Sequence, residues 1–97
     1  MRSCVKYVRT HIPELPFGNA DDFRPNTELD VGVVAILKFP PSERYPNGTQ
    51  HLAYVDEVWP HAFHIKQTNR VSNTYTEEWV DVNDPKVVGF YLPNIDK

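Results

Sequence analysis

The fold of this chain is decided by two runs of residues, His51-Leu52-Ala53-Tyr54-Val55-Asp56-Glu57-Val58 and Ala62-Phe63-His64-Ile65-Lys66-Gln67-Thr68-Asn69. Both are rich in residues that favour β-strands, and only Trp59-Pro60-His61 separates them. We therefore predict an antiparallel hairpin about Pro60, in which the numbers of paired residues sum to about 120.

This register predicts which side chains share a face, because paired residues share a side and sides alternate along each strand. Val58 is expected opposite Ala62, and His51 opposite Asn69. One face then carries His51, Ala53, Val55, Phe63, Ile65, Gln67 and Asn69. This face is apolar near the turn and polar at the open end. A shift by one residue would separate the two sets, so the register is testable.

The flanking sequence predicts helices before this hairpin and further strands around it. Val5, Val8 and Ile12 fall on one helical stripe, which Ser3 would cap and Pro13 would end. Similar patterns predict a second short helix over residues 19–24 and strands over 31–39, 75–82 and 87–92. Helices followed by an antiparallel meander indicate an α+β fold.

Length and composition exclude several classes of protein. The 97 residues, 40% of them hydrophobic, fit a single domain over residues 1–97. The net charge is −3 and the basic residues are scattered, which argues against a nucleic-acid partner. The longest apolar run, Val33–Leu37, is too short to span a membrane. The domain begins directly after Met1-Arg2-Ser3, so we expect no signal peptide and synthesis in the cytoplasm.

The single cysteine, Cys4, is the strongest candidate for chemistry. At the first helical position it would lie beside free N–H groups and the positive end of the helix dipole, which stabilise a thiolate. In the predicted hairpin, His51 lies near the carboxamides of Gln67 and Asn69, which could orient its imidazole. Because Ala53 is small and shares this face, a helix could approach there and bring Cys4 to His51.

Two simpler interpretations stay open. A cysteine near a helix start is more often an inert small hydrophobe, and a histidine at a strand end is more often a half-exposed surface residue. The aromatic residues Trp59, Trp79, Tyr54 and Tyr75 are either core or the lining of a groove; the sequence does not separate these. His61 and His64 lack a cysteine or a nearby carboxylate pair, so no metal site is expected.

Six segments resemble the CHAP family, the cysteine- and histidine-dependent amidohydrolases and peptidases with a papain-like fold. In chain order they are Ser3-Cys4-Val5-Lys6-Tyr7-Val8, Pro16-Phe17-Gly18-Asn19-Ala20-Asp21-Asp22-Phe23, Gly32-Val33-Val34-Ala35-Ile36, His51-Leu52-Ala53-Tyr54-Val55, Gln67-Thr68-Asn69-Arg70 and Gly89-Phe90-Tyr91. The resemblance covers nearly the whole chain in the family's order. It implies short N-terminal helices packed on a small antiparallel sheet.

The resemblance also implies roles for individual residues. Cys4 would be the nucleophile and His51 the general base. Gln67 takes the place of the family's usual glutamate, and Asn69 that of its asparagine. A glutamine can orient an imidazole but stabilises imidazolium less than a carboxylate does. Substrate contacts are expected from Asn19, Asp22, Trp59 and Tyr54. A calcium site upstream of the cysteine, which some members have, is not expected here.

The function implied by this resemblance is hydrolysis of an amide bond in bacterial peptidoglycan, by an amidase or endopeptidase that needs no cofactor. Such an enzyme would act at the cell wall after release, as in phage lysis (an endolysin), in a virion or as a secreted effector. Two alternatives stay open. One is a non-catalytic CHAP-like binding or structural module, which Gln67 in place of glutamate favours. The other is a thiol hydrolase of another amide. The sequence does not indicate the oligomeric state.

Overall fold

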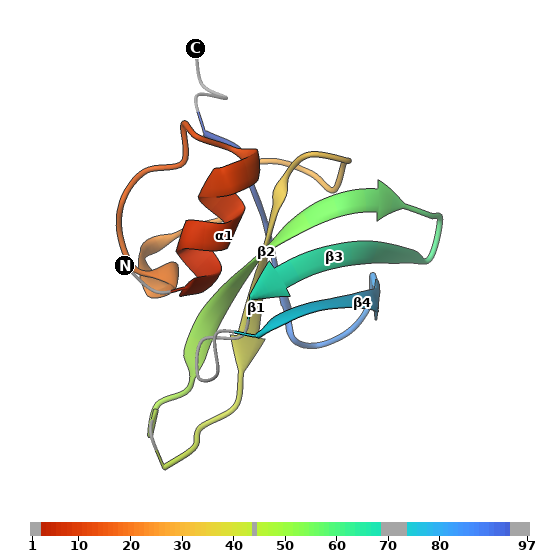
Figure 1. The fold of residues 1–97 in the computed structure, drawn as a ribbon. Helices are drawn as coiled ribbons and strands as arrows, with labels where there is room; N and C mark the ends of the chain where they lie inside the picture. Colours follow the sequence, from red (N-terminus) through yellow and green to blue (C-terminus); the bar gives the residue numbers. More distant parts are fainter. Residues whose placement is uncertain (1–2, 44, 69–73, 94–97) are drawn as a thin grey trace.

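The computed structural model describes residues 3–43, 45–68 and 74–93 and shows an α+β fold. One antiparallel sheet has the strand order β4-β3-β2-β1-β5. A short α-helix covers one of its faces (Figure 1). The elements are α1 (Ser3–His11), the 3₁₀ helix η1 (Ala20–Asp22), β1 (Val34–Phe39), β2 (Thr49–Val58), β3 (Ala62–Thr68), β4 (Tyr75–Asp81) and β5 (Val87–Tyr91).

The helix α1 buries the apolar stripe that its sequence predicts. Val5 and Val8 are fully buried, and Ile12 follows directly after the helix with its N–H bonded to the Val8 carbonyl at 2.9 Å. Pro13 then prevents further helical hydrogen bonding, as predicted. The helix begins at Ser3, one residue earlier than expected, so Cys4 lies within its first turn. In the described part of the chain, no helix is long and apolar enough to cross a membrane.

The predicted second helix over residues 19–24 is only the three-residue η1. Asn19 precedes it, and the Asn19 N–H donates to the Asp22 carboxylate at 3.2 Å. The segment is already extended at Phe23 (φ −82°, ψ 141°), and Pro25 disfavours a helical conformation at the next residue, Arg24. This part of the helix prediction was therefore wrong in length.

The predicted hairpin register is confirmed in its middle and wrong near the turn. Val55 pairs with Ile65 and Tyr54 with Lys66, which gives the predicted sum of 120. A β-bulge between Val55 and Glu57 then shifts the pairing by one, so Val58 faces Phe63 and not Ala62. The predicted partner of His51, Asn69, lies outside the described residues.

The sheet carries a separate hydrophobic cluster on each face. The helix-side cluster consists of Cys4, Val5, Val8, Ile12, Leu15, Ala20, Phe23, Val34, Ile36 and Leu52. The cluster on the other face consists of Val33, Ala35, Leu37, Ala53, Val55, Phe63, Ile65 and Val80. The helix thus packs over Leu52 and not over Ala53, so the predicted approach at Ala53 was wrong. The larger Leu52 side chain offers α1 more apolar surface to bury.

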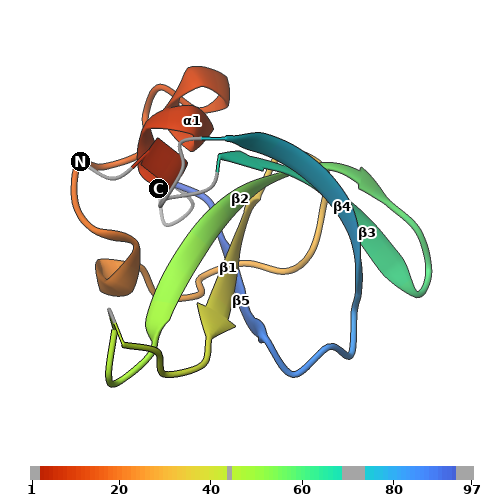
Figure 2. The ribbon, with the colours of Figure 1, turned by 60° about the horizontal axis from the view of Figure 1, so that its bottom comes forward.

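The chain is not a simple meander, because β5 pairs with β1 and not with β4. The sheet is strongly curved, as Figure 2 shows. This curvature brings Phe63 of β3 within 5.3 Å, centroid to centroid, of Phe90 of β5 in an edge-to-face contact, although two strands separate them in the sheet order. On its other side, β5 accepts a 2.9 Å hydrogen bond from the Asn26 N–H at Phe90.

We expect Gly48→Ala to destabilise the fold more than Gly32→Ala. Both glycines have positive φ, 77° and 93°, a conformation that costs other residues about 1–2 kcal/mol. A Cβ at Gly48 would also lie 2.8 Å from the Phe39 carbonyl oxygen, whereas nothing lies within 4 Å of one at Gly32. Urea unfolding of both variants measures the difference, expected at about 1 kcal/mol or more. Equal losses would contradict a clash at the β1–β2 turn.

Candidate functional site

Three segments that are distant in the sequence meet at the start of β2. Gln50 joins β2 to η1: its backbone N–H donates to the Asp21 carboxylate at 2.7 Å. Its side-chain amide donates to the carbonyls of Ala20 at 2.8 Å and Phe23 at 3.2 Å. Ala20 and Phe23 belong to the same cluster as α1. The sequence did not predict this anchoring role of Gln50, because its partners lie about thirty residues away.

Cys4 lies in the first turn of α1, as predicted, and is fully buried. It belongs to the helix-side cluster, which contains Ala20 and Leu52. Side chains alternate along β2, so His51 points with Ala53 to the other face of the sheet. The predicted meeting of Cys4 and His51 was therefore wrong, because α1 packs on the face that Leu52 occupies. The fold therefore holds the thiol at the junction of α1, η1 and the start of β2. Cys4 takes this position only when α1, η1 and β2 are packed together.

His51 is buried, with 3% of its surface exposed, so the interpretation as a half-exposed surface residue was wrong. Its Nε2 lies 2.7 Å from Oε1 of Gln67, and its ring lies 5.4 Å from that of Phe39. A carboxamide oxygen can only accept, so Nε2 donates and carries the proton. In the neutral imidazole, Nδ1 is then the basic atom. The predicted pairing of His51 with Gln67 is thus present, and Asn69 lies outside the described residues.

Asn19 and Asp22, two of the predicted substrate-binding residues, lie together. Both are exposed, and they line an open pocket of about 310 Å³ with Phe17 and Gly18. The intervening Ala20 is buried in the cluster that contains Cys4. The pocket therefore adjoins the segment that packs around the thiol.

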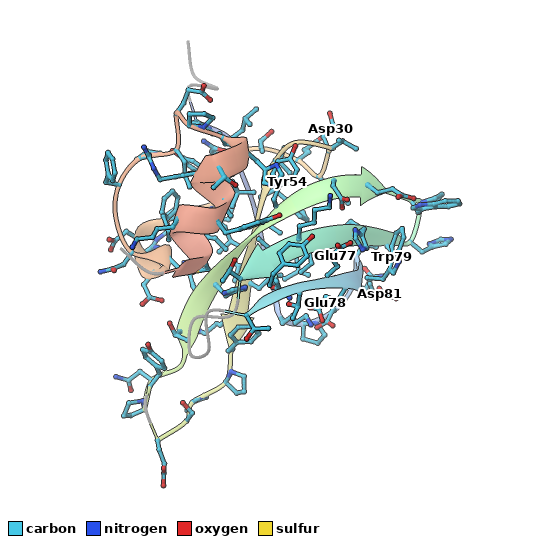
Figure 3. The ribbon with its side chains drawn as sticks, viewed as in Figure 1. Asp30, Tyr54, Glu77, Glu78, Trp79 and Asp81 are labelled. Carbon is cyan, nitrogen blue, oxygen red and sulfur yellow. The ribbon has the colours of Figure 1, made fainter. Side chains whose placement is uncertain are left out.

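The two predicted aromatic contacts lie elsewhere. Tyr54 is half-buried beside α1, where its ring stacks on that of His11 with centroids 4.1 Å apart (Figure 3). Trp59 is 58% exposed and follows the end of β2, eight residues after His51, a separation of roughly 25 Å along an extended strand. The structure does not bring Trp59 to His51, and Trp59 and Trp79 are surface residues and not core.

The sequence did not predict a second, partly buried polar group at His64. The ring of His64 lies between two carboxylates, with Nδ1 2.7 Å from Asp56 and Nε2 3.4 Å from Glu77. The sequence indicated no pair of carboxylates near His64, but the structure shows one, formed by Asp56 and Glu77. Residue spacing gave no signal for it, because Glu77 comes from the neighbouring strand. Within residues 3–43, 45–68 and 74–93, no three histidine, cysteine or acidic side chains are arranged to hold a metal ion.

Glu77 also accepts a hydrogen bond from the Tyr75 hydroxyl at 2.7 Å. This bond raises the pKa of Tyr75 above its ordinary value, because the phenolate would lose the bond and face a negative charge. The Tyr75 ring lies 5.5 Å from that of Tyr7 in α1, so β4 and the helix are in contact at this edge.

Comparison of the chain with protein families, with curated proteins and with solved structures found no match.

Proposed function

We propose that the chain is a cysteine amidohydrolase or peptidase of the CHAP type, with a papain-like arrangement, that cleaves an amide bond of bacterial peptidoglycan. The observation that carries this proposal is the hydrogen bond between the buried His51 and the half-buried Gln67. Burying an imidazole costs free energy unless it is paired, and this pair occurs at the two positions that the family pattern uses. The position of Cys4 in the first turn of a helix, where free N–H groups stabilise a thiolate, supports it further.

The proposed reaction requires Cys4 to leave its buried position on the helix side of the sheet and meet His51. His51 Nδ1 then takes the proton from the Cys4 thiol, and the thiolate attacks the carbonyl carbon of the amide. Backbone N–H groups at the start of α1 donate to the oxyanion that forms. The imidazolium then gives its proton to the leaving amine as the C–N bond breaks. A water molecule, deprotonated by His51, hydrolyses the resulting thioester and restores the thiol.

Gln67 is the positioning residue in this scheme. Its Oε1 holds the Nε2 proton and so keeps the basic lone pair on Nδ1. It adds no negative charge, so the imidazolium is stabilised less than it would be by a carboxylate. The pocket of Asn19 and Asp22 is the proposed contact for the peptide or glycan part of the substrate.

Full burial of Cys4, on the face of the sheet opposite to that of His51, favours a second candidate, the non-catalytic module. A nucleophile must reach a carbonyl carbon, whereas a buried cysteine can serve as a small apolar core residue. Gln67, which is neutral where the family usually has a glutamate, also favours the non-catalytic module. In this case the pocket of Asn19 and Asp22 would bind the wall without cutting it.

The experiment that tests the proposal is incubation of purified peptidoglycan sacculi with the protein, followed by mass spectrometry of the soluble fraction. Fragments with a new amine and a new carboxylate end would establish amide hydrolysis, and their masses would identify the bond. Sacculi that stay intact but bind the protein in a pelleting assay would establish the non-catalytic module. Cleavage of an isopeptide-linked protein substrate alone would establish a different thiol hydrolase.

We expect Gln67→Glu to raise the pKa of His51, because a carboxylate favours the imidazolium form. The proposed thiolate–imidazolium pair should then persist to higher pH, and the alkaline limb of the hydrolysis profile should move upward. NMR titration of the His51 ring measures the pKa directly, apart from activity. Gln67→Ala is the control, since it removes the hydrogen bond and should not raise the pKa. An unchanged His51 pKa in Gln67→Glu would contradict the proposed role.

A further inference from the structure

Two exposed tryptophans form a rigid aromatic surface at the end of the sheet that lies away from Cys4. Trp59 and Trp79 are 58% and 53% exposed, and their rings meet edge to face with centroids 6.4 Å apart. The indole N–H of Trp59 donates to the carboxylate of Glu57, and the ring of Trp79 lies against His64. Both rings are therefore fixed while their faces remain in solvent.

The groups around these rings are mainly acidic. Trp79, Glu77 and Asp81 alternate along β4 and so share one side of it. Their partners on β3 are His64, Lys66 and Ala62, which lie on the same side of the sheet. Lys66 is engaged by Asp56 at 3.6 Å and Glu77 lies 3.4 Å from His64, so neither Lys66 nor His64 reaches Glu57 or Asp81.

We infer that Trp59, Trp79, Glu57, Glu77 and Asp81 form a docking surface for a basic peptide segment of a partner protein. Exposed tryptophan faces attract lysine and arginine side chains, most strongly when carboxylates flank them. Tryptophan is also enriched at the centres of protein interfaces. A neutral glycan could stack on the rings but would gain nothing from the excess negative charge, so the observations favour a cationic segment. This site is independent of the proposed hydrolase.

Intrinsic fluorescence can report binding at this surface, because Trp59 and Trp79 are the only two tryptophans of the chain. Tryptophan fluorescence during titration with a short peptide of alternating arginine and serine should change saturably. Binding should weaken as salt is raised, since the charges lie at the surface. The same peptide with glutamate in place of arginine should give no response. Because this readout does not involve hydrolysis, its result is separate from that of the sacculus assay.

Matched variants locate the site. The double variant Glu77→Gln, Asp81→Asn should weaken binding roughly tenfold, because it removes two exposed charges beside Trp79. Glu78→Gln should leave binding unchanged, since Glu78 lies on the other side of β4 and pairs with Lys86 at 3.4 Å. Equal weakening by both variants would overturn the proposal, because it would indicate only general attraction to an acidic protein. A response to chitin oligosaccharides and not to the basic peptide, or fluorescence changes caused by self-association in sedimentation, would also overturn it.

Discussion

Cys4→Ala is expected to abolish release of soluble fragments from peptidoglycan, with a fall in rate of about a thousandfold or more. The reason is that the proposed thioester cannot form without the sulfur, while His51 and Gln67 alone can only position a water molecule. Release is measured by mass spectrometry of sacculus digests made with the parent and the variant at equal concentrations. In the parent, iodoacetamide should alkylate Cys4 well below pH 8, where an ordinary thiol reacts slowly.

The control for this substitution is to show that the Cys4→Ala variant still folds. Cys4 is fully buried in the cluster with Leu52, so alanine leaves a small cavity that a folding defect could amplify. Circular dichroism and urea unfolding establish that the variant is folded. His51→Ala should lose activity to a similar extent, since base and nucleophile act as a unit. A folded Cys4→Ala variant that still releases fragments would refute the cysteine mechanism.

Phe63→Ala is expected to cost about 3–5 kcal/mol of the free energy of unfolding. Phe63 is fully buried on the face of the sheet away from α1, and its ring meets that of Phe90. Its loss removes the contact that joins β3 to β5 across the curved sheet. Such a loss is a large part of the stability of a small domain, so the variant should unfold at much lower urea concentration.

The matched control is Phe17→Ala, which removes the same side chain from a position that is 76% exposed. The Arg9 guanidinium lies 3.9 Å from the centroid of the Phe17 ring, but such exposed contacts contribute little. We expect a change within about 0.5 kcal/mol. If the two variants lost similar stability, the cluster around Phe63 would not be the main core of the sheet.

The elements that the sequence predicted well are those set by neighbouring residues. The strand patterns around Val55 and Ile65 fixed the hairpin register, because a shift by one would expose the apolar set. The stripe of Val5 and Val8 predicted α1, and Pro13 predicted its end. The bulge after Val55 could not be predicted, because an extra residue in one strand leaves the composition of the hairpin unchanged.

In the candidate site, the sequence predicted the placement of Cys4 in the first helical turn and the approach of His51 to Gln67, since both follow from local periodicity. It did not predict Gln50, whose hydrogen bonds reach residues about thirty positions away in η1. Nor did it find His64 between Asp56 and Glu77, because the third residue comes from β4.

The sequence by itself determined the α+β class, the position of the helix and the central hairpin, because these depend on residues that are near neighbours in the chain. Only the tertiary structure decided that α1 packs over Leu52, that β5 pairs with β1, and that Trp59 lies far from His51 along β2. These outcomes depend on which apolar surfaces are buried together and on how the sheet curves. Which surfaces are buried depends on all elements of the chain at once, so the pattern within one segment does not predict it.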